Sequence, residues 1–123
     1  MRESRLWFWH ILSSVVILIL LGIHMGTMHL SEILEMMGFG SGEPVDASAV
    51  FERSRQAVYM VAYILLLGAG LFHGLYGLRS IFFELSLPKG AEKTIGSILA
   101  VAGIALFIYG SYVAIALFQT RGV

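Results

Sequence analysis

The 123-residue sequence contains no cysteine, only two prolines and few charged side chains. Without cysteine, the chain cannot form a disulfide, a thiolate nucleophile, a zinc–thiolate site or a cysteine-held iron–sulfur cluster. Any iron–sulfur chemistry must therefore belong to a partner protein. Eight basic and eight acidic residues balance each other, and no basic run is present that would favour binding of nucleic acid.

Hydrophobic residues are present in large excess. They make up 58% of the chain and charged residues 13%, with a mean hydropathy of +0.84, whereas soluble domains contain about 45–50% and about 25%. This composition indicates a single membrane domain, residues 1–123. The basic N-terminus before an apolar run is similar to a signal peptide, but the run is long and lacks an Ala-x-Ala-like cleavage site. We expect a retained membrane-spanning helix.

Three apolar segments are long enough to cross a bilayer, which takes about 20 residues. They predict an all-α membrane protein with helices over about 7–37, 49–83 and 94–118. Small residues suited to close helix packing recur in the third segment: Gly96, Ala100, Gly103 and Ala105.

Positive charges are distributed unevenly between the two sides of these three spans. One side would carry Arg2, Arg5, Arg79, Lys89 and Lys93, and the other Arg53, Arg55 and Arg121. Cytoplasmic segments are enriched in basic residues. The distribution therefore predicts that the N-terminus lies inside and the C-terminus outside.

Two histidines lie deep in the predicted spans. At 1.5 Å per residue, His73 lies roughly 16 Å from the inner end of its helix, and His24 lies roughly 25 Å along the first helix. His10 lies near the inner interface, and His29 reaches the outer boundary of the bilayer. Because His24 and His73 lie at different depths, they are not expected to pair with each other.

The helix face that contains His73 combines an imidazole with small residues. An interval of 3, 4, 7 or 11 residues returns to nearly the same face. This face carries Gly70, Gly77, Ser80 and Glu84, with Tyr76 beside it. Glycines above and below a histidine leave room for a broad, flat group, and haem iron accepts a neutral imidazole as axial ligand. A bis-histidine site would need its second ligand from another chain.

Structural roles explain the same residues equally well at this point. An intramembrane histidine can serve only to hydrogen-bond neighbouring helices, and glycines can serve only helix packing. Arg79 can extend to lipid phosphate. A proton-conducting subunit that uses Glu32, Glu35 and the two deep histidines is disfavoured, because both acids lie outside the hydrocarbon core.

Several motifs occur together in a particular order. They are an aromatic start before Ser13-Ser14, Leu21-Gly22-Ile23-His24-Met25, His73-x-x-x-Gly77-x-Arg79 followed by Glu84, and Gly110-Ser111-Tyr112-Val113. In this order and spacing, nearly the whole chain resembles the small three-helix, cytochrome b-type membrane anchor subunits of succinate dehydrogenase and fumarate reductase.

This resemblance implies a subunit of a larger complex in the inner membrane of a prokaryote. A second anchor subunit would share the helical bundle, and an iron–sulfur protein and a flavoprotein would dock on it. Electrons would pass between the iron–sulfur protein and quinone bound among the anchor helices, and the complex would hold one or two b-type haems shared with the second anchor. The chain itself would be non-catalytic, because the chemistry of succinate belongs to the flavoprotein.

The resemblance also implies roles for individual residues. His73 would ligate a proximal haem and His24 a distal one, with His29 as the alternative distal ligand. The proximal haem and its propionates would be surrounded by Arg79, His10, Gly70, Gly77 and Tyr76.

Glu84-Leu85 replaces the Asp-Tyr of some family members, so a tyrosine donor to quinone is missing at this position. Ser80 and Glu84 remain as candidate quinone contacts. A haem-free structural anchor and a fumarate reductase anchor are the alternatives. Either small anchor, either direction of reaction, either ubiquinone or menaquinone, and single or trimeric complexes all fit the resemblance.

Overall fold

The computed structural model of the chain describes residues 2–38, 52 and 56–120, and it contains three long helices. Helix α1 is Arg2–Met36, α3 is Ala57–Glu84 and α4 is Lys89–Gln119. No strand occurs in these described ranges. The predicted all-α fold is confirmed.

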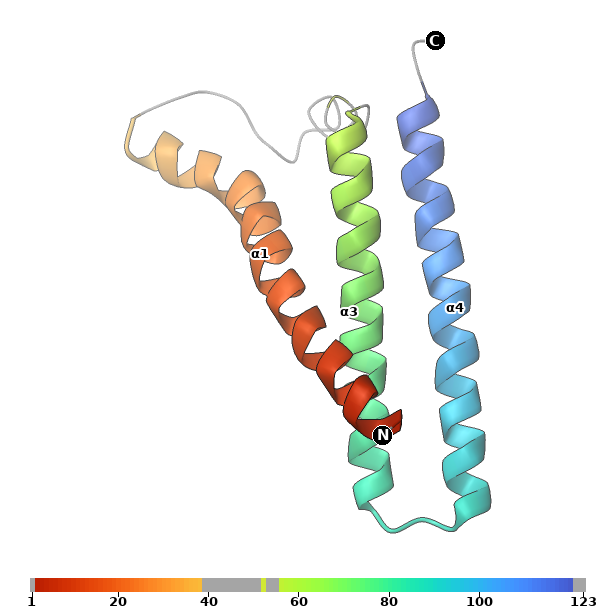
Figure 1. Cartoon of the computed structure of the whole chain (residues 1–123). Helices are drawn as coiled ribbons and strands as arrows, with labels where there is room; N and C mark the ends of the chain where they lie inside the picture. The colour runs from red at the N-terminus through yellow and green to blue at the C-terminus, as the bar shows by residue number, and fades with distance from the viewer. Residues whose placement is uncertain (1, 39–51, 53–55, 121–123) are drawn as a thin grey trace.

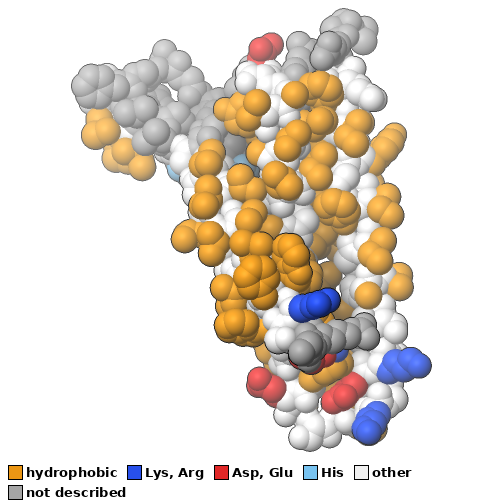
Figure 2. All heavy atoms as spheres, viewed as in Figure 1, with side chains coloured by type: hydrophobic (Ala, Val, Ile, Leu, Met, Phe, Trp, Pro, Cys, Tyr) orange, Lys and Arg blue, Asp and Glu red, His pale blue; other side chains and the backbone are white. Residues whose placement is uncertain are grey.

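All three helices have the length and composition of a membrane span. The apolar stretches are Glu3–Gly26 within α1, Ala57–Glu84 and Lys89–Gln119. No hydrophobic residue in the described part of the chain is buried, and Leu18 and Val58 are 75% and 77% exposed. Figure 2 shows hydrophobic side chains over the middle of the molecule, with most of the visible charges toward the end where α3 and α4 are connected. The prediction of three membrane helices is confirmed.

The helices start at residues that hydropathy does not identify. Helix α4 begins at Lys89, earlier than the predicted residue 94, directly after Pro88 with φ −58°. Pro88 is the N-cap, with ψ 144°, and its carbonyl accepts the N–H of Glu92 at 3.1 Å, which starts the helix. The first turns of α4 contain Lys89, Glu92 and Lys93, and this charge excluded them from the predicted span.

The second predicted helix also differs at its start. Gln56 has an extended backbone, with φ −90° and ψ 126°, so α3 begins at Ala57 and not at residue 49. The remainder of the predicted polar turns, residues 49–51 and 53–55, lies outside the described residues, as does most of the predicted loop between the first two helices.

Helix α3 lies between the other two helices. In Figure 1, α4 runs alongside α3, whereas α1 crosses α3 obliquely and diverges from it toward the C-terminal end of α1. Ring contacts pair His10 with His73 and His24 with Tyr63, so α1 and α3 are antiparallel. The backbones of α1 and α4 do not approach each other closely over the described residues.

Large side chains on α3 and α4 fit against glycines on the opposite helix. A Cβ added at Gly103 would lie 2.6 Å from Leu75 Cδ1, and one at Gly68 would lie 3.1 Å from Phe107 Cε2. Leu67 occupies the space beside Gly110 in the same way. Of the small residues predicted to pack closely, Gly96, Ala100 and Gly103 line a groove between α3 and α4, whereas Ala105 does not. Close packing therefore needs glycine at particular positions of α4.

The connection from α3 to α4 is short and conformationally demanding. The N–H of Leu85 donates to the carbonyl of Phe82 at 3.2 Å, and this bond closes the last turn of α3. Ser86 follows with φ +53°, in the left-handed region that favours glycine. This turn allows α4 to run back along α3 after four residues, 85–88.

Candidate functional site

His73 is held against α1 through one of its two ring nitrogens. Its Nδ1 lies 3.1 Å from Ser14 Oγ, 3.4 Å from Ser13 Oγ and 3.4 Å from the carbonyl oxygen of His10. Ser13 is 7% exposed and is the buried polar residue of the described chain. The deepest polar cluster between α1 and α3 is therefore built around the His73 imidazole.

The His10 ring stacks on the His73 ring. The ring centroids are 4.2 Å apart and the planes are 2° from parallel. A Cβ added at Gly77 would lie 3.6 Å from His10 Cε1, and Tyr76 lies 5.0 Å from His10 by ring centroids. The space beside Gly77 is thus occupied by His10, although the sequence suggested that it would be left open for a separate flat group.

Other glycines of α3 remain open. A Cβ added at Gly70 or Gly74 would meet nothing within 4 Å. Both positions lie within four residues of His73. The surface of α3 next to the polar cluster is therefore flat and accessible.

His24 lies at a different level of the molecule. Its ring makes an edge contact with Tyr63 at 5.8 Å, and it lines a hollow of about 290 Å³ with Leu20, Tyr59 and neighbouring apolar residues. Tyr63 precedes His73 by ten residues, roughly 15 Å along α3. The two histidines are therefore separate positions in the structure. His29 is exposed and lies beyond the apolar stretch of α1.

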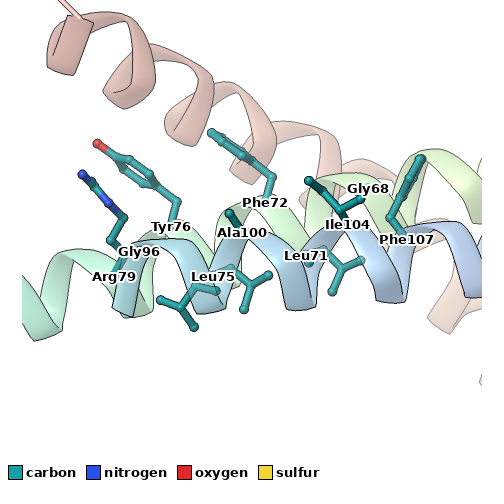
Figure 3. Close-up of a pocket in the computed structure, with 12 residues that line it drawn as sticks. Gly68, Leu71, Phe72, Leu75, Tyr76, Arg79, Gly96, Ala100, Ile104 and Phe107 are labelled. Carbon is teal, nitrogen blue, oxygen red and sulfur yellow. The ribbon is translucent and has the colours of Figure 1, made fainter. Parts of the chain in front are cut away.

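Arg79 lies beside α4 and against the last turn of α3. Its Cζ lies 4.2 Å from the centroid of the Phe83 ring and 6.0 Å from that of Tyr76, and its Nε would lie 3.8 Å from a Cβ added at Gly96. Figure 3 shows Arg79 and Tyr76 with their polar ends at one end of an apolar groove between α3 and α4, and this groove has a volume of about 490 Å³. Tyr76 therefore lies near both Arg79 and His10.

Ser80 and Glu84 do not line this groove. The Ser80 hydroxyl donates to the carbonyl of Tyr76 at 3.0 Å, and Glu84 is exposed at the end of α3. The hydroxyl proton of Ser80 is thus already used within its own helix.

The two serines of α1 are the part of the cluster that sequence reasoning missed. Hydroxyls in apolar helices commonly bond to their own backbone, and Ser13 and Ser14 do donate to the His10 carbonyl, at 2.6 and 3.1 Å. They contact His73 with the same oxygens. The available signal was the stripe His10, Ser13 and His24, whose spacing places all three on one face of α1.

The fold and this cluster define an integral membrane protein of three spanning helices with a histidine–serine site between the first two. Residues 2–110 match the family described as the succinate dehydrogenase/fumarate reductase transmembrane subunit, and the chain belongs to that family. It is similar to the succinate dehydrogenase hydrophobic membrane anchor subunit of Archaeoglobus fulgidus, with 23% identity over 110 residues that cover 89% of this chain and 86% of the relative. No solved structure matches the chain. The chain is therefore a membrane anchor subunit of the succinate dehydrogenase/fumarate reductase family.

Proposed function

We propose that the chain is the haem b-binding anchor of a succinate:quinone oxidoreductase, with Nε2 of His73 as an axial iron ligand. The observation that carries this proposal is the use of the two ring nitrogens. Every hydrogen bond of His73 with the described residues involves Nδ1, and none involves Nε2. A haem ligand needs this pattern, because one nitrogen binds iron while the other is oriented by the protein.

The surroundings of His73 fit a flat macrocycle. Gly70 and Gly74 leave the adjoining surface of α3 open, and Phe72 and Tyr76 add stacked aromatic surface with ring centroids 5.7 Å apart. A second anchor subunit would supply the other iron ligand, because His24 lies too far along the bundle. When bound, haem b would supply one-electron chemistry within the complex.

His24 is the proposed ligand of a distal haem. It lines a hollow among aromatic and apolar side chains, whereas the competing His29 is exposed outside the apolar stretch. An ionisable side chain within a membrane span is costly, so a histidine at such a position usually has a function. This favours His24 over His29.

Arg79, His10 and Tyr76 are proposed to surround the proximal haem propionates. A guanidinium pairs well with carboxylate, and Arg79 lies at the polar end of the α3–α4 groove beside Tyr76. The same end of the groove suits a quinone carbonyl. Ser80 and Glu84 are the weaker quinone candidates, because the Ser80 proton is bonded to Tyr76 and Glu84 is exposed.

The exposed apolar surface supports shared helix packing with a second anchor. Large side chains such as Leu18, Ile104 and Tyr109 are 62–75% exposed, and lipid together with partner helices would cover them. We place the N-terminus in the cytoplasm of a prokaryote, which brings the charged helix ends beside the α3–α4 connection to the side where the iron–sulfur protein and the flavoprotein would dock.

Purification of the intact complex tests this function. We expect flavoprotein, iron–sulfur protein and a second anchor to co-purify in equal amounts with this chain, and a reduced-minus-oxidised spectrum to show haem b. His24→Ala should remove one haem where two are present, and His29→Ala should leave both. Absence of haem b from the stoichiometric wild-type complex would overturn the proposal.

A haem-free structural anchor is the second candidate. The observation that favours it is that the Nδ1 contacts of His73 already join α1 to α3 without any cofactor. In this case the four subunits assemble in equal amounts and no haem spectrum is found. A fumarate reductase anchor is distinguished by the relative rates of succinate oxidation and fumarate reduction in the same preparation.

A further inference from the structure

We propose that Ser13, Ser14 and the backbone carbonyl of His10 are positioning elements that keep the proton of the His73 imidazole on Nδ1 and its lone pair on Nε2. This inference rests on the proposed haem function, because it assigns the reason why Nε2 is the iron-binding atom. It concerns residues of α1, whereas the ligand itself belongs to α3.

The backbone carbonyl of His10 favours one tautomer of His73. The His10 oxygen lies 3.4 Å from His73 Nδ1, and a carbonyl can only accept a hydrogen bond. A neutral imidazole has one N–H and one acceptor nitrogen. If the lone pair were on Nδ1, it would face the lone pairs of this oxygen. The carbonyl therefore favours the tautomer with hydrogen on Nδ1.

The direction in which the serine hydroxyls donate also affects the tautomer of His73. Each hydroxyl has a single proton to donate. Ser13 donates its proton to the His10 carbonyl at 2.6 Å, whereas His73 Nδ1 is 3.4 Å away, so toward the imidazole Ser13 presents only lone pairs. Ser14 Oγ lies 3.1 Å from both the same carbonyl and His73 Nδ1, and when its proton goes to the carbonyl it accepts from Nδ1. Three oxygens thus lie within 3.4 Å of His73 Nδ1.

Burial of Ser13 strengthens this preference for one tautomer. Ser13 is 7% exposed, and no other described polar residue is as buried. In such surroundings an unpaired polar group is expensive and an electrostatic preference is strong. The wrong tautomer would therefore be strongly disfavoured. The His10 ring, parallel to His73 at 4.2 Å, also opposes rotation of the imidazole out of this arrangement.

The consequence for iron is electronic. Acceptors on the outer N–H of a ligating histidine raise the basicity of the nitrogen that binds the metal. A more basic ligand stabilises the oxidised, more positively charged iron. The α1 serines should therefore hold the potential of the haem lower than an imidazole without these acceptors would.

The test compares the purified whole complex of the wild type with that of the Ser13→Ala/Ser14→Ala double variant. Ser97→Ala is the matched control, because Ser97 makes the same kind of bond to its own helix, to the Lys93 carbonyl at 2.9 Å, but is exposed on α4. The readouts are haem content, the low-spin electron paramagnetic resonance signal and the midpoint potential by redox titration.

We expect the double variant to retain haem. Its equilibrium between oxidised and reduced haem should move toward the reduced form by up to roughly tenfold, which is an upward shift of the midpoint potential of up to about 59 mV for one electron. The resonance signal should change with it, and Ser97→Ala should match the wild type. If the double variant loses haem, the single variants Ser13→Ala and Ser14→Ala should each shift the midpoint potential of the haem upward. Ser14→Thr, which retains a hydroxyl, should have the wild-type potential.

Haem retained at the wild-type potential with an unchanged resonance signal would overturn the role of the serines and leave the haem function intact. A wild-type complex without haem b would overturn both.

Discussion

The imidazole rings of His10 and His73 are stacked, with their centroids 4.2 Å apart and an angle of 2° between their planes. This contact joins α1 to α3 and places the two histidines at one level. His10 lies within the apolar stretch Glu3–Gly26 and not at its edge. The histidine–serine cluster therefore lies between two helices, with groups of α1 in contact with a histidine of α3.

Gly77 controls this stacking by its size. A Cβ there lies 3.6 Å from His10 Cε1, an ordinary contact, so Gly77→Ala should leave the complex unchanged. Gly77→Leu should push the His10 ring away from His73 and destabilise the subunit by about 1–3 kcal/mol, the usual cost of overpacking. Thermal unfolding of the purified complex measures the difference. Equal unfolding temperatures for the alanine and leucine variants would show that His10 does not occupy this space.

The α3–α4 packing can be tested with cysteine pairs, because the chain has no cysteine of its own. Leu75 Cδ1 lies 2.6 Å from the position that a Cβ on Gly103 would take, so the two residues face each other across α3 and α4. Oxidation of Leu75→Cys/Gly103→Cys should therefore produce a cross-link within the chain, detected after proteolysis between the helices. Leu75→Cys/Ala105→Cys is the control that should not cross-link. The reverse pattern would mean that α4 is rotated.

Ser86 is a residue whose replacement should stabilise the protein. Its φ of +53° is costly for a residue with a Cβ and free of this cost for glycine. We expect Ser86→Gly to raise stability by about 1 kcal/mol and Ser86→Pro to lower it, because proline cannot adopt a positive φ. Thermal unfolding of both variants in the complex is the measurement. A glycine variant less stable than the wild type would contradict this turn geometry.

Quinone binding should depend on Tyr76 more than on Ser80. The Ser80 proton is bonded to the Tyr76 carbonyl at 3.0 Å, whereas the Tyr76 side chain lines the groove. Loss of one hydrogen bond to a ligand costs about 1 kcal/mol. We therefore expect Tyr76→Phe to raise the KM for quinone about fivefold and Ser80→Ala to leave it unchanged. Steady-state kinetics with varied quinone distinguish the two variants, and a larger effect of Ser80→Ala would assign the donor to Ser80.

The sequence predicts the number of helices, the different depths of His24 and His73, and the exclusion of a cofactor held by thiolates. Hydropathy and the rise of a helix determine these features, and both are local. The sequence does not predict that His10 and Gly77 meet. In helices that are apolar on all sides, no amphipathic pattern indicates which face packs on a neighbour. The crossing of α1 and α3, and with it the rotation of His10 onto His73, depends on tertiary packing.

The positions of the helix ends are likewise not predicted by hydropathy. The charged first turns of α4 and the extended backbone at Gln56 result from capping and chain geometry, not from hydropathy. The double use of the Ser13 hydroxyl, which donates to the His10 carbonyl and contacts His73, is likewise visible only when two helices are in place.

The central claim is that His73 binds haem iron, and the reduced-minus-oxidised spectrum of the purified His73→Ala complex tests it most directly. The flavoprotein and iron–sulfur subunits, measured in the same sample, report whether the complex has assembled. We predict that the assembled variant lacks the haem b signal of the proximal site. A fully assembled variant with the wild-type haem content and an unchanged spectrum would contradict the claim.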